Sequence, residues 1–211
     1  MKALVLDFDG TLADTRAGIV AAMQHTLSEM GLSVVDESEI CRRIGLPLEN
    51  TLAELAGLQG SALQRAVGLY RECYGSVGFN RATLFPNVAS TLAHLCRRRV
   101  GIAVASGKGK AALVALLERL GVSRYISAVY GEQDAVRKKP APDVALTAMQ
   151  ALGCSPGETL VVGDTVYDVR MGREAGCKTC AVLYGNGLPD ELRGEQPDYM
   201  IGNFGELIQF F

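Results

Sequence analysis

The chain opens on a short apolar run that ends in two acids, because residues 3–11 have the sequence ALVLDFDGT. The apolar part, Ala3 to Leu6, predicts a buried strand of the kind found inside parallel sheets. Asp7 and Asp9 follow at once and lie two positions apart, so in extended backbone their carboxylates share a face. The stretch therefore predicts a strand that delivers paired acids to one cavity, with Gly10 permitting a tight turn behind them.

The rest of the chain alternates short apolar strands with amphipathic helices. Further strands are expected at 101–105, 128–130, 159–162 and 179–183, with an edge strand at 199–201, and helices at 110–120, 142–152 and 166–175. This alternation predicts an α/β fold in which a parallel sheet is covered by helices on both faces. Ligands bind such a sheet at the carboxyl ends of its strands.

Nearly ninety residues separate the first strand from the second, and they have a helical pattern throughout. Helices are expected at 16–30, 37–44, 48–56 and 61–74. A simple crossover between parallel strands needs far fewer residues. We therefore expect an inserted helical cap domain at 16–81, a core domain made of 1–15 and 82–211, and a return hinge at 75–85.

Composition excludes several classes of function. The 211 residues are 48% hydrophobic and carry a net charge of -2, so no global field favours nucleic acid. No apolar run approaches the length of a membrane span, and the N-terminal run is too short for a signal peptide. We expect a cytoplasmic protein without nucleic-acid or membrane partners. A monomer and a homodimer both remain open.

Cys177 and Cys180 form the only C-x-x-C pair among six cysteines. A zinc site would need a second pair or nearby histidines, and His25 and His94 lie in no motif. In a strand, this odd spacing points the two thiols to opposite faces. We expect both to be small buried hydrophobic residues.

Four other polar groups follow predicted strands or precede predicted helices. Asp164 follows the fourth strand, where together with Asp7 it would form the oxygen-rich site that Mg²⁺ prefers, and Asp168 lies one helical turn further on. Ser106 and Gly107 follow the second strand and offer a hydroxyl and backbone N–H groups to a phosphate.

Lys139 and Thr11 complete the set. Lys139, held by Pro140, would balance the charge of the carboxylates and a phosphoryl group, and we expect only one of the three cations at 137–139 to point inward. Thr11 offers a hydroxyl to a carboxylate or an oxyanion. Of Asp7 and Asp9, one can attack phosphorus, and the other can protonate the leaving group.

These motifs resemble those of the haloacid dehalogenase superfamily of phosphohydrolases over essentially the whole chain. Residues 7–15, DFDGTLADT, look like the family's first motif, Ser106 its second, Lys139 its third, and Gly163-Asp164 with Asp168 its fourth. The resemblance implies a Rossmann-like doubly wound sheet of strand order 5-4-1-2-3 with a helical cap. It also implies a Mg²⁺-dependent phosphatase that acts on a small phosphorylated metabolite.

The resemblance also implies a role for each site residue. Asp7 would be the nucleophile and a Mg²⁺ ligand, and Asp9 the general acid and base, with its carbonyl on the metal. Asp164 would bind Mg²⁺, and Asp168 would be a ligand or support one. Thr11, Ser106, Gly107 and Lys139 would bind the phosphate, and Lys139 would also be catalytic.

The substrate is less constrained. Residues 44–49, IGLPLE, and 184–187, YGNG, resemble phosphoglycolate phosphatases and related pyrophosphatases, which makes Leu46 a candidate specificity residue. Cap arginines that could read a carboxylate or second phosphate are Arg16, Arg42, Arg43 and Arg81. A pyrophosphatase and a sugar-phosphate phosphatase remain alternatives.

Three further readings are weaker. A β-phosphoglucomutase would usually carry a Ser-Arg pair at the cap loop, where this chain has Pro47-Leu48. A phosphoacceptor signalling module is usually far shorter and lacks a cap. A catalytically silent binding module finds no support, because every motif residue is present.

Overall fold

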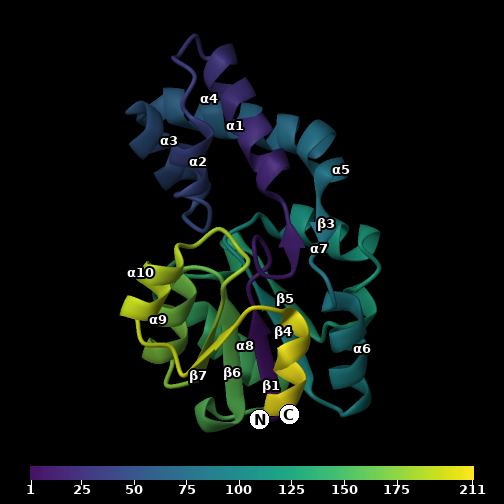
Figure 1. The fold of residues 1–211 in the computed structure, drawn as a ribbon. Coiled ribbons are helices and arrows are strands. Elements are labelled where there is room, and N and C mark those ends of the chain that lie inside the picture. Colours follow the sequence, from purple (N-terminus) through teal and green to yellow (C-terminus); the bar gives the residue numbers. More distant parts are fainter.

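The computed structural model describes residues 1–211 and contains a six-stranded parallel sheet at its centre (Figure 1). Its strands are β1 (Ala3–Leu6), β4 (Gly101–Ala105), β5 (Ala128–Tyr130), β6 (Thr159–Gly163), β7 (Lys178–Val182) and β8 (Tyr199–Ile201). They lie in the order β5-β4-β1-β6-β7-β8. This order confirms the predicted one, and β8 lies at the edge of the sheet, where the strand at 199–201 was expected.

Alternate residues of the strands enter two hydrophobic clusters, one on each face of the sheet. Leu4 and Leu6 belong to the larger cluster, whereas Val5 belongs to the other. A strand buried on both faces has no polar alternation, which explains the continuous apolar run at residues 3–6. β1 is fully buried and lies between β4 and β6, so Asp7 emerges near the middle of the sheet edge.

Helices cover both faces. α8 (Asp143–Leu152) and α9 (Val166–Glu174) pack on the face of Val5, and α10 (Pro189–Gly194) packs beside α9. α6 (Val88–Arg97), α7 (Lys110–Arg119) and the 3₁₀ segment Phe204–Phe210 contribute to the cluster on the opposite face. α6 and α10 are elements for which no range was expected from the sequence.

The inserted helices lie beyond the carboxyl ends of the strands, apart from the sheet (Figure 1). They are α1 (Arg16–Glu29), α2 (Glu37–Cys41), α3 (Leu48–Ala56), α4 (Gly60–Cys73) and α5 (Phe79–Arg81), with a π-helical turn at Tyr74–Gly78. We refer to this helical unit as the cap. Its assignment as a separate domain at 16–81 stays a prediction.

Two short antiparallel strands, β2 (Ala13–Asp14) and β3 (Thr83–Leu84), connect the cap to the sheet. The segment expected as the return hinge at 75–85 has regular structure: it is helical up to Arg81, and Thr83–Leu84 pair with β2. Its role as a hinge stays a prediction. Gly78 packs against Gly18 of α1, and neither position has room for a Cβ atom.

The cysteines behave as the spacing predicted. Cys177 and Cys180 are buried in hydrophobic clusters on opposite faces of the sheet, and all six cysteines are free thiols. None of the helices has the length and apolar character needed to cross a lipid bilayer.

Candidate active site

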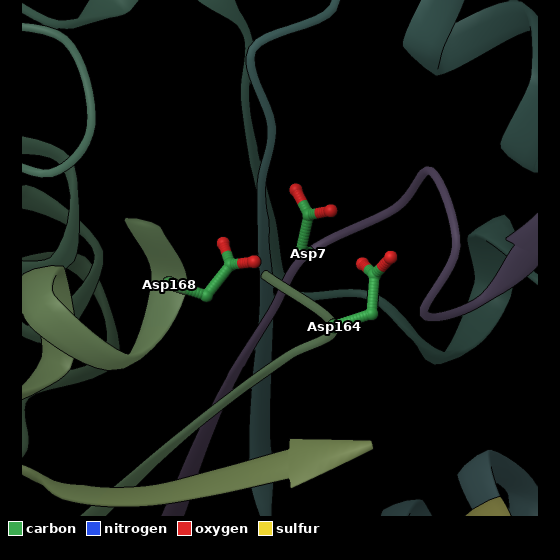
Figure 2. A group of neighbouring side chains, drawn as sticks. All are labelled: Asp7, Asp164 and Asp168. Atoms are coloured by element: carbon green, nitrogen blue, oxygen red, sulfur yellow. The ribbon is translucent and has the colours of Figure 1, made fainter. Parts of the chain in front are cut away.

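Three carboxylates meet where β1 and β6 end. Asp7 follows β1, Asp164 follows β6, and Asp168 lies in the first turn of α9; one oxygen from each lies within 4.8 Å of the other two (Figure 2). The register places Leu6 beside Val162, and the Asp7 amide donates to the Val162 carbonyl at 2.9 Å. Adjacent parallel strands therefore bring together acids that are more than 150 positions apart.

Asp164 is held from two sides. The Thr11 hydroxyl donates to its Oδ1 at 2.9 Å, and the Asn186 amide donates to its Oδ2 at 2.7 Å. Gly10 has a φ of +85°, and a Cβ there would lie 2.1 Å from Asp164 Oδ2, so only glycine fits this turn. Of the two uses expected for the Thr11 hydroxyl, the structure shows the carboxylate; its binding of a phosphate stays a prediction.

Lys139 lies between Asp7 and Asp168. Its Nζ is 2.7 Å from Asp7 Oδ1 and 2.6 Å from Asp168 Oδ1, and its side chain is 7% exposed. Of the three neighbouring cations, Lys139 alone has a buried side chain, as expected, since those of Lys138 and Arg137 are 41% and 69% exposed. Asp168 also accepts from the Thr165 amide and hydroxyl at the start of α9. Asp168 therefore caps α9 and also holds the Lys139 ammonium in place.

The three acids carry more negative charge than one lysine neutralises. Burial, together with Asp168, raises the pKa of Asp164 to about 7. Burial also raises the pKa of Asp7 well above its usual value, with Asp168 and Asp164 adding to the effect and Lys139 opposing it. The ammonium of Lys139 has a raised pKa because Asp168 and Asp7 outweigh its burial. A divalent cation bound to Asp7 and Asp164 would relieve this repulsion, so the carboxylate cluster fits the Mg²⁺ that the family implies.

Asp9 lies beside this cluster with different partners. The Thr15 hydroxyl donates to its Oδ1 at 2.6 Å, and Lys108 Nζ lies 3.2 Å from the same oxygen. Lys108 is almost buried and lies 4.2 Å above the ring of Tyr74 in the cap. Sequence reasoning missed Lys108 and Thr15, although both stand inside the motifs it used.

Ser106 and Gly107 follow β4 and line the same cavity as Asp7 and Asp9. Ser106 is buried, and its Oγ accepts from the Lys108 amide at 3.2 Å, which shapes the turn before α7. The structure thus brings the expected phosphate-binding residues to the side of the cavity that faces the acids. Their contact with phosphate stays a prediction.

The cavity has a volume of about 350 Å³ and lies between the strand ends and the cap. Arg43 and Leu46 line it, whereas Arg16, Arg42 and Arg81 do not. Arg16 instead donates to Asn186 Oδ1 and the Gly185 carbonyl, both at 3.1 Å, and so ties the start of α1 to the loop after β7. The cavity is close to the lower end of the range typical of small-molecule sites, roughly 300–1,000 Å³.

The acid cluster lies at the switch point of a doubly wound parallel sheet, below the cap, which is where α/β enzymes of this architecture bind their ligands. The sequence profile described as haloacid dehalogenase-like hydrolase matches residues 4–182. The chain belongs to this family, and the prediction of a phosphatase of the haloacid dehalogenase superfamily is confirmed.

Relatives and solved structures agree with this assignment. The chain is 34% identical to the "Probable phosphatase IndB" of Dickeya dadantii, an alignment that covers 99% of this chain and 93% of that protein. It is 32% identical to the pyrophosphatase PpaX of Oceanobacillus iheyensis (99% and 95% covered) and 28% identical to the phosphoglycolate phosphatase of Escherichia coli O157:H7 (99% and 91%). A haloacid dehalogenase-like hydrolase of Bacteroides fragilis, 27% identical, superposes with a TM-score of 0.92 over 98% of this chain and 99% of that one.

Proposed function

We propose that the chain hydrolyses a small phosphate monoester with the help of Mg²⁺ and through a phosphorylated Asp7. The observation that carries this proposal is the position of Lys139, whose Nζ contacts Asp7 and Asp168 beside Asp164. The contact holds one Asp7 oxygen, and Asp7 lines the cavity; we assign the attack on phosphorus to its other oxygen.

The two acids of the first motif divide the chemistry. A carboxylate oxygen of Asp7 forms a bond to phosphorus as the bond from phosphorus to the leaving oxygen breaks, and the Asp9 carboxyl gives its proton to that oxygen. Asp9 then takes a proton from water, which attacks phosphorus and releases Asp7 and inorganic phosphate. Thr15 and Lys108 orient Asp9 for both transfers.

The neighbouring residues stabilise charge. Asp7, the carbonyl of Asp9 and Asp164 would hold Mg²⁺, which supplies positive charge against the transferring phosphoryl group. Lys139 adds a fixed ammonium, and the Ser106 hydroxyl and the amide of Gly107 offer donors to the phosphoryl oxygens. Asp168 keeps Lys139 in place.

The substrate class is that of small phosphorylated metabolites, in line with the named relatives. The E. coli relative is named for phosphoglycolate and the Oceanobacillus relative for pyrophosphate, and both leaving groups would fit the volume of the cavity. A sugar phosphate remains a further candidate.

Hydrolysis of p-nitrophenyl phosphate tests the mechanism. We expect turnover with Mg²⁺, none with excess chelator, and a loss of at least about 10³-fold in kcat for Asp7→Asn. Asp190→Asn is the matched control, because Asp190 is 95% exposed on α10 and lies outside the cavity. Wild-type protein that is inactive with Mg²⁺, or an Asp7→Asn variant as active as Asp190→Asn, would sink the proposal.

A further inference from the structure

Apolar side chains from several cap helices line the cavity, alongside Arg43 and Arg71. Ile19 and Met23 of α1, Ile40 of α2, Leu48 of α3 and Phe79 of α5 all line it. They come from four helices, so the apolar lining is not the accidental exposure of one helix face. Met23 and Ile40 are only 1% exposed, so a leaving group that reaches past Asp9 meets mainly the partly exposed Leu48 and Phe79.

Two tyrosines add a flat surface to this lining. Tyr70 of α4 and Tyr74, the first residue of the π-helical turn, stack with ring centroids 5.9 Å apart and an interplanar angle of 16°. Both line the cavity, and Lys108 occupies a face of the Tyr74 ring. Stacked aromatic rings favour planar or apolar groups, and the one polar atom that the buried Tyr74 adds is a hydroxyl without a hydrogen-bond partner, which is uncharged.

Every cation on the cavity wall already has an acidic partner. Arg43 lies 2.9 Å from Glu39 and 3.2 Å from Glu54. Lys108 lies 3.2 Å from Asp9.

Arg71 is neutralised in the same way. It lies 3.2 Å from Glu132 and 3.7 Å from Glu49. No free arginine or lysine therefore remains beyond the phosphate end to receive a second anionic group.

We propose that the leaving group of the substrate is an uncharged, largely apolar alcohol with room for a ring. The inference rests on the proposed function and narrows its substrate. A carboxylate or second phosphate in the cap end would lose its hydration among Leu46, Leu48 and Phe79 without gaining a free cation. An apolar group there gains the burial that the same side chains offer. The proposed leaving group is thus uncharged, whereas the compounds for which the pyrophosphatase and phosphoglycolate phosphatase relatives are named carry a second anionic group.

Benzyl phosphate and phosphoglycolate form a matched pair of probes. Both carry the phosphate on a methylene oxygen, and they differ in a phenyl ring against a carboxylate. At equal Mg²⁺ and pH 7.5 we expect kcat/KM for benzyl phosphate to exceed that for phosphoglycolate by roughly tenfold or more. An equal or larger value for phosphoglycolate overturns the inference and leaves the mechanism standing. No turnover of either probe or of p-nitrophenyl phosphate overturns the proposed function instead.

A double variant tests the electrostatic reason. Glu39→Gln with Glu54→Gln frees Arg43 at the cavity wall, and we expect the preference for benzyl phosphate to fall severalfold through a lower KM for phosphoglycolate. Glu195→Gln is the control, since it frees Arg170 and Arg173 on the core surface, away from the cavity. If the ratio of kcat/KM for benzyl phosphate to that for phosphoglycolate changes equally in both variants, or in neither, the pairing of Arg43 is not the cause of the selectivity.

Discussion

The two ends of the cavity are built in opposite ways. At the core end, polar groups meet across great sequence distance: Thr11 with Asp164 over 153 positions and Lys139 with Asp7 over 132. At the cap end, Arg43 pairs with Glu39 only four positions away, and apolar side chains line part of the remaining wall. The register of the buried sheet fixes the positions of the polar groups at the core end, whereas contacts between nearby helical residues fix those at the cap end.

The difference teaches which part of the enzyme is free to vary. Moving Asp7 relative to Asp164 would require a shift of β1 against β6, which would disturb the packing of both sheet faces. The chain enters and leaves the cap through β2 and β3, two residues each, and the remaining contacts between cap and core are between side chains or side chain and backbone, such as Arg16 with Asn186. Replacing a cap side chain therefore changes what the cavity accepts while the acid cluster keeps its geometry.

Replacing Asp9 by asparagine should give the largest effect on turnover after loss of the nucleophile. Asn keeps the shape and still accepts from Thr15, but it neither donates a proton to the leaving oxygen nor takes one from water. We expect kcat to fall by roughly 10²–10⁴-fold while the melting temperature changes little. Kinetics with p-nitrophenyl phosphate and thermal melts measure both.

The control for this experiment is a substrate with a very good leaving group. If Asp9 acts as the general acid, the loss in the first step should shrink for 2,4-dinitrophenyl phosphate, which needs little protonation. Equal losses for both esters in single-turnover experiments, or an unfolded variant, would contradict the acid role. The comparison then shows whether the core end performs the chemistry alone.

The sheet and the acid cluster were predictable from the sequence. A strand buried on both faces leaves an unmistakable apolar run, and β1, β4 and β5 begin and end at the residues expected. Asp7, Asp164 and Lys139 could be found because each stands directly beyond a strand or before a helix. Positions at strand ends are set by topology, and topology follows from the order of the elements.

The connections and the cap surface were less predictable. The segment 75–85 has two glycines and an asparagine, which favour a loop, but packing of Gly78 against Gly18 keeps it helical. Whether a cap arginine faces the cavity depends on how its helix is rotated about its axis, which the sequence does not show. Arg43 lines the cavity, whereas Arg16 binds the Gly185 carbonyl and the Asn186 side chain. Lys108 was missed because its partners, Asp9 and Tyr74, come from two different units of the fold.

The affinity for Mg²⁺ should depend on pH through Asp164. Its pKa is raised to about 7 by burial and by Asp168, and its carboxylate must lose the proton before it binds a cation. We expect the apparent affinity to fall by up to about tenfold per unit as pH drops from 7 to 6, and to level off above pH 8. Titration calorimetry at several pH values measures this. An affinity that is flat between pH 6 and 8 would contradict it.

The same shift has a consequence for stability without metal. The pKa of Asp164 in the fold lies above the unfolded value of roughly 3.9, so the folded state holds more protons between about pH 4 and 7. The melting temperature of the chelator-treated protein should therefore decrease as pH rises through this window, and added Mg²⁺ should restore it. Asp164→Asn should reduce this part of the pH dependence, which separates it from other titrating groups.

The smallest expected effect concerns the contact between the two ends. Arg71 of α4 lies 3.2 Å from Glu132, a buried core carboxylate that also pairs with Lys138 at 2.6 Å. Because Arg71 is half exposed, Arg71→Gln should change the free energy of unfolding by less than about 1 kcal/mol. Arg71 and Glu132 pair at the cavity wall where cap and core meet, so we expect KM to rise roughly two- to fivefold with kcat unchanged, and the difference to shrink at high salt.

Arg65→Gln on the same helix provides the comparison, since Arg65 is exposed and forms no ion pair. If both variants raise KM equally, the effect belongs to the net charge of the cap and not to the pairing with Glu132. If Arg71→Gln lowers kcat instead, the arginine acts on the reacting phosphate rather than on closure. A KM that rises only for Arg71→Gln, and only at low salt, means that the core and the cap meet through this ion pair before chemistry begins.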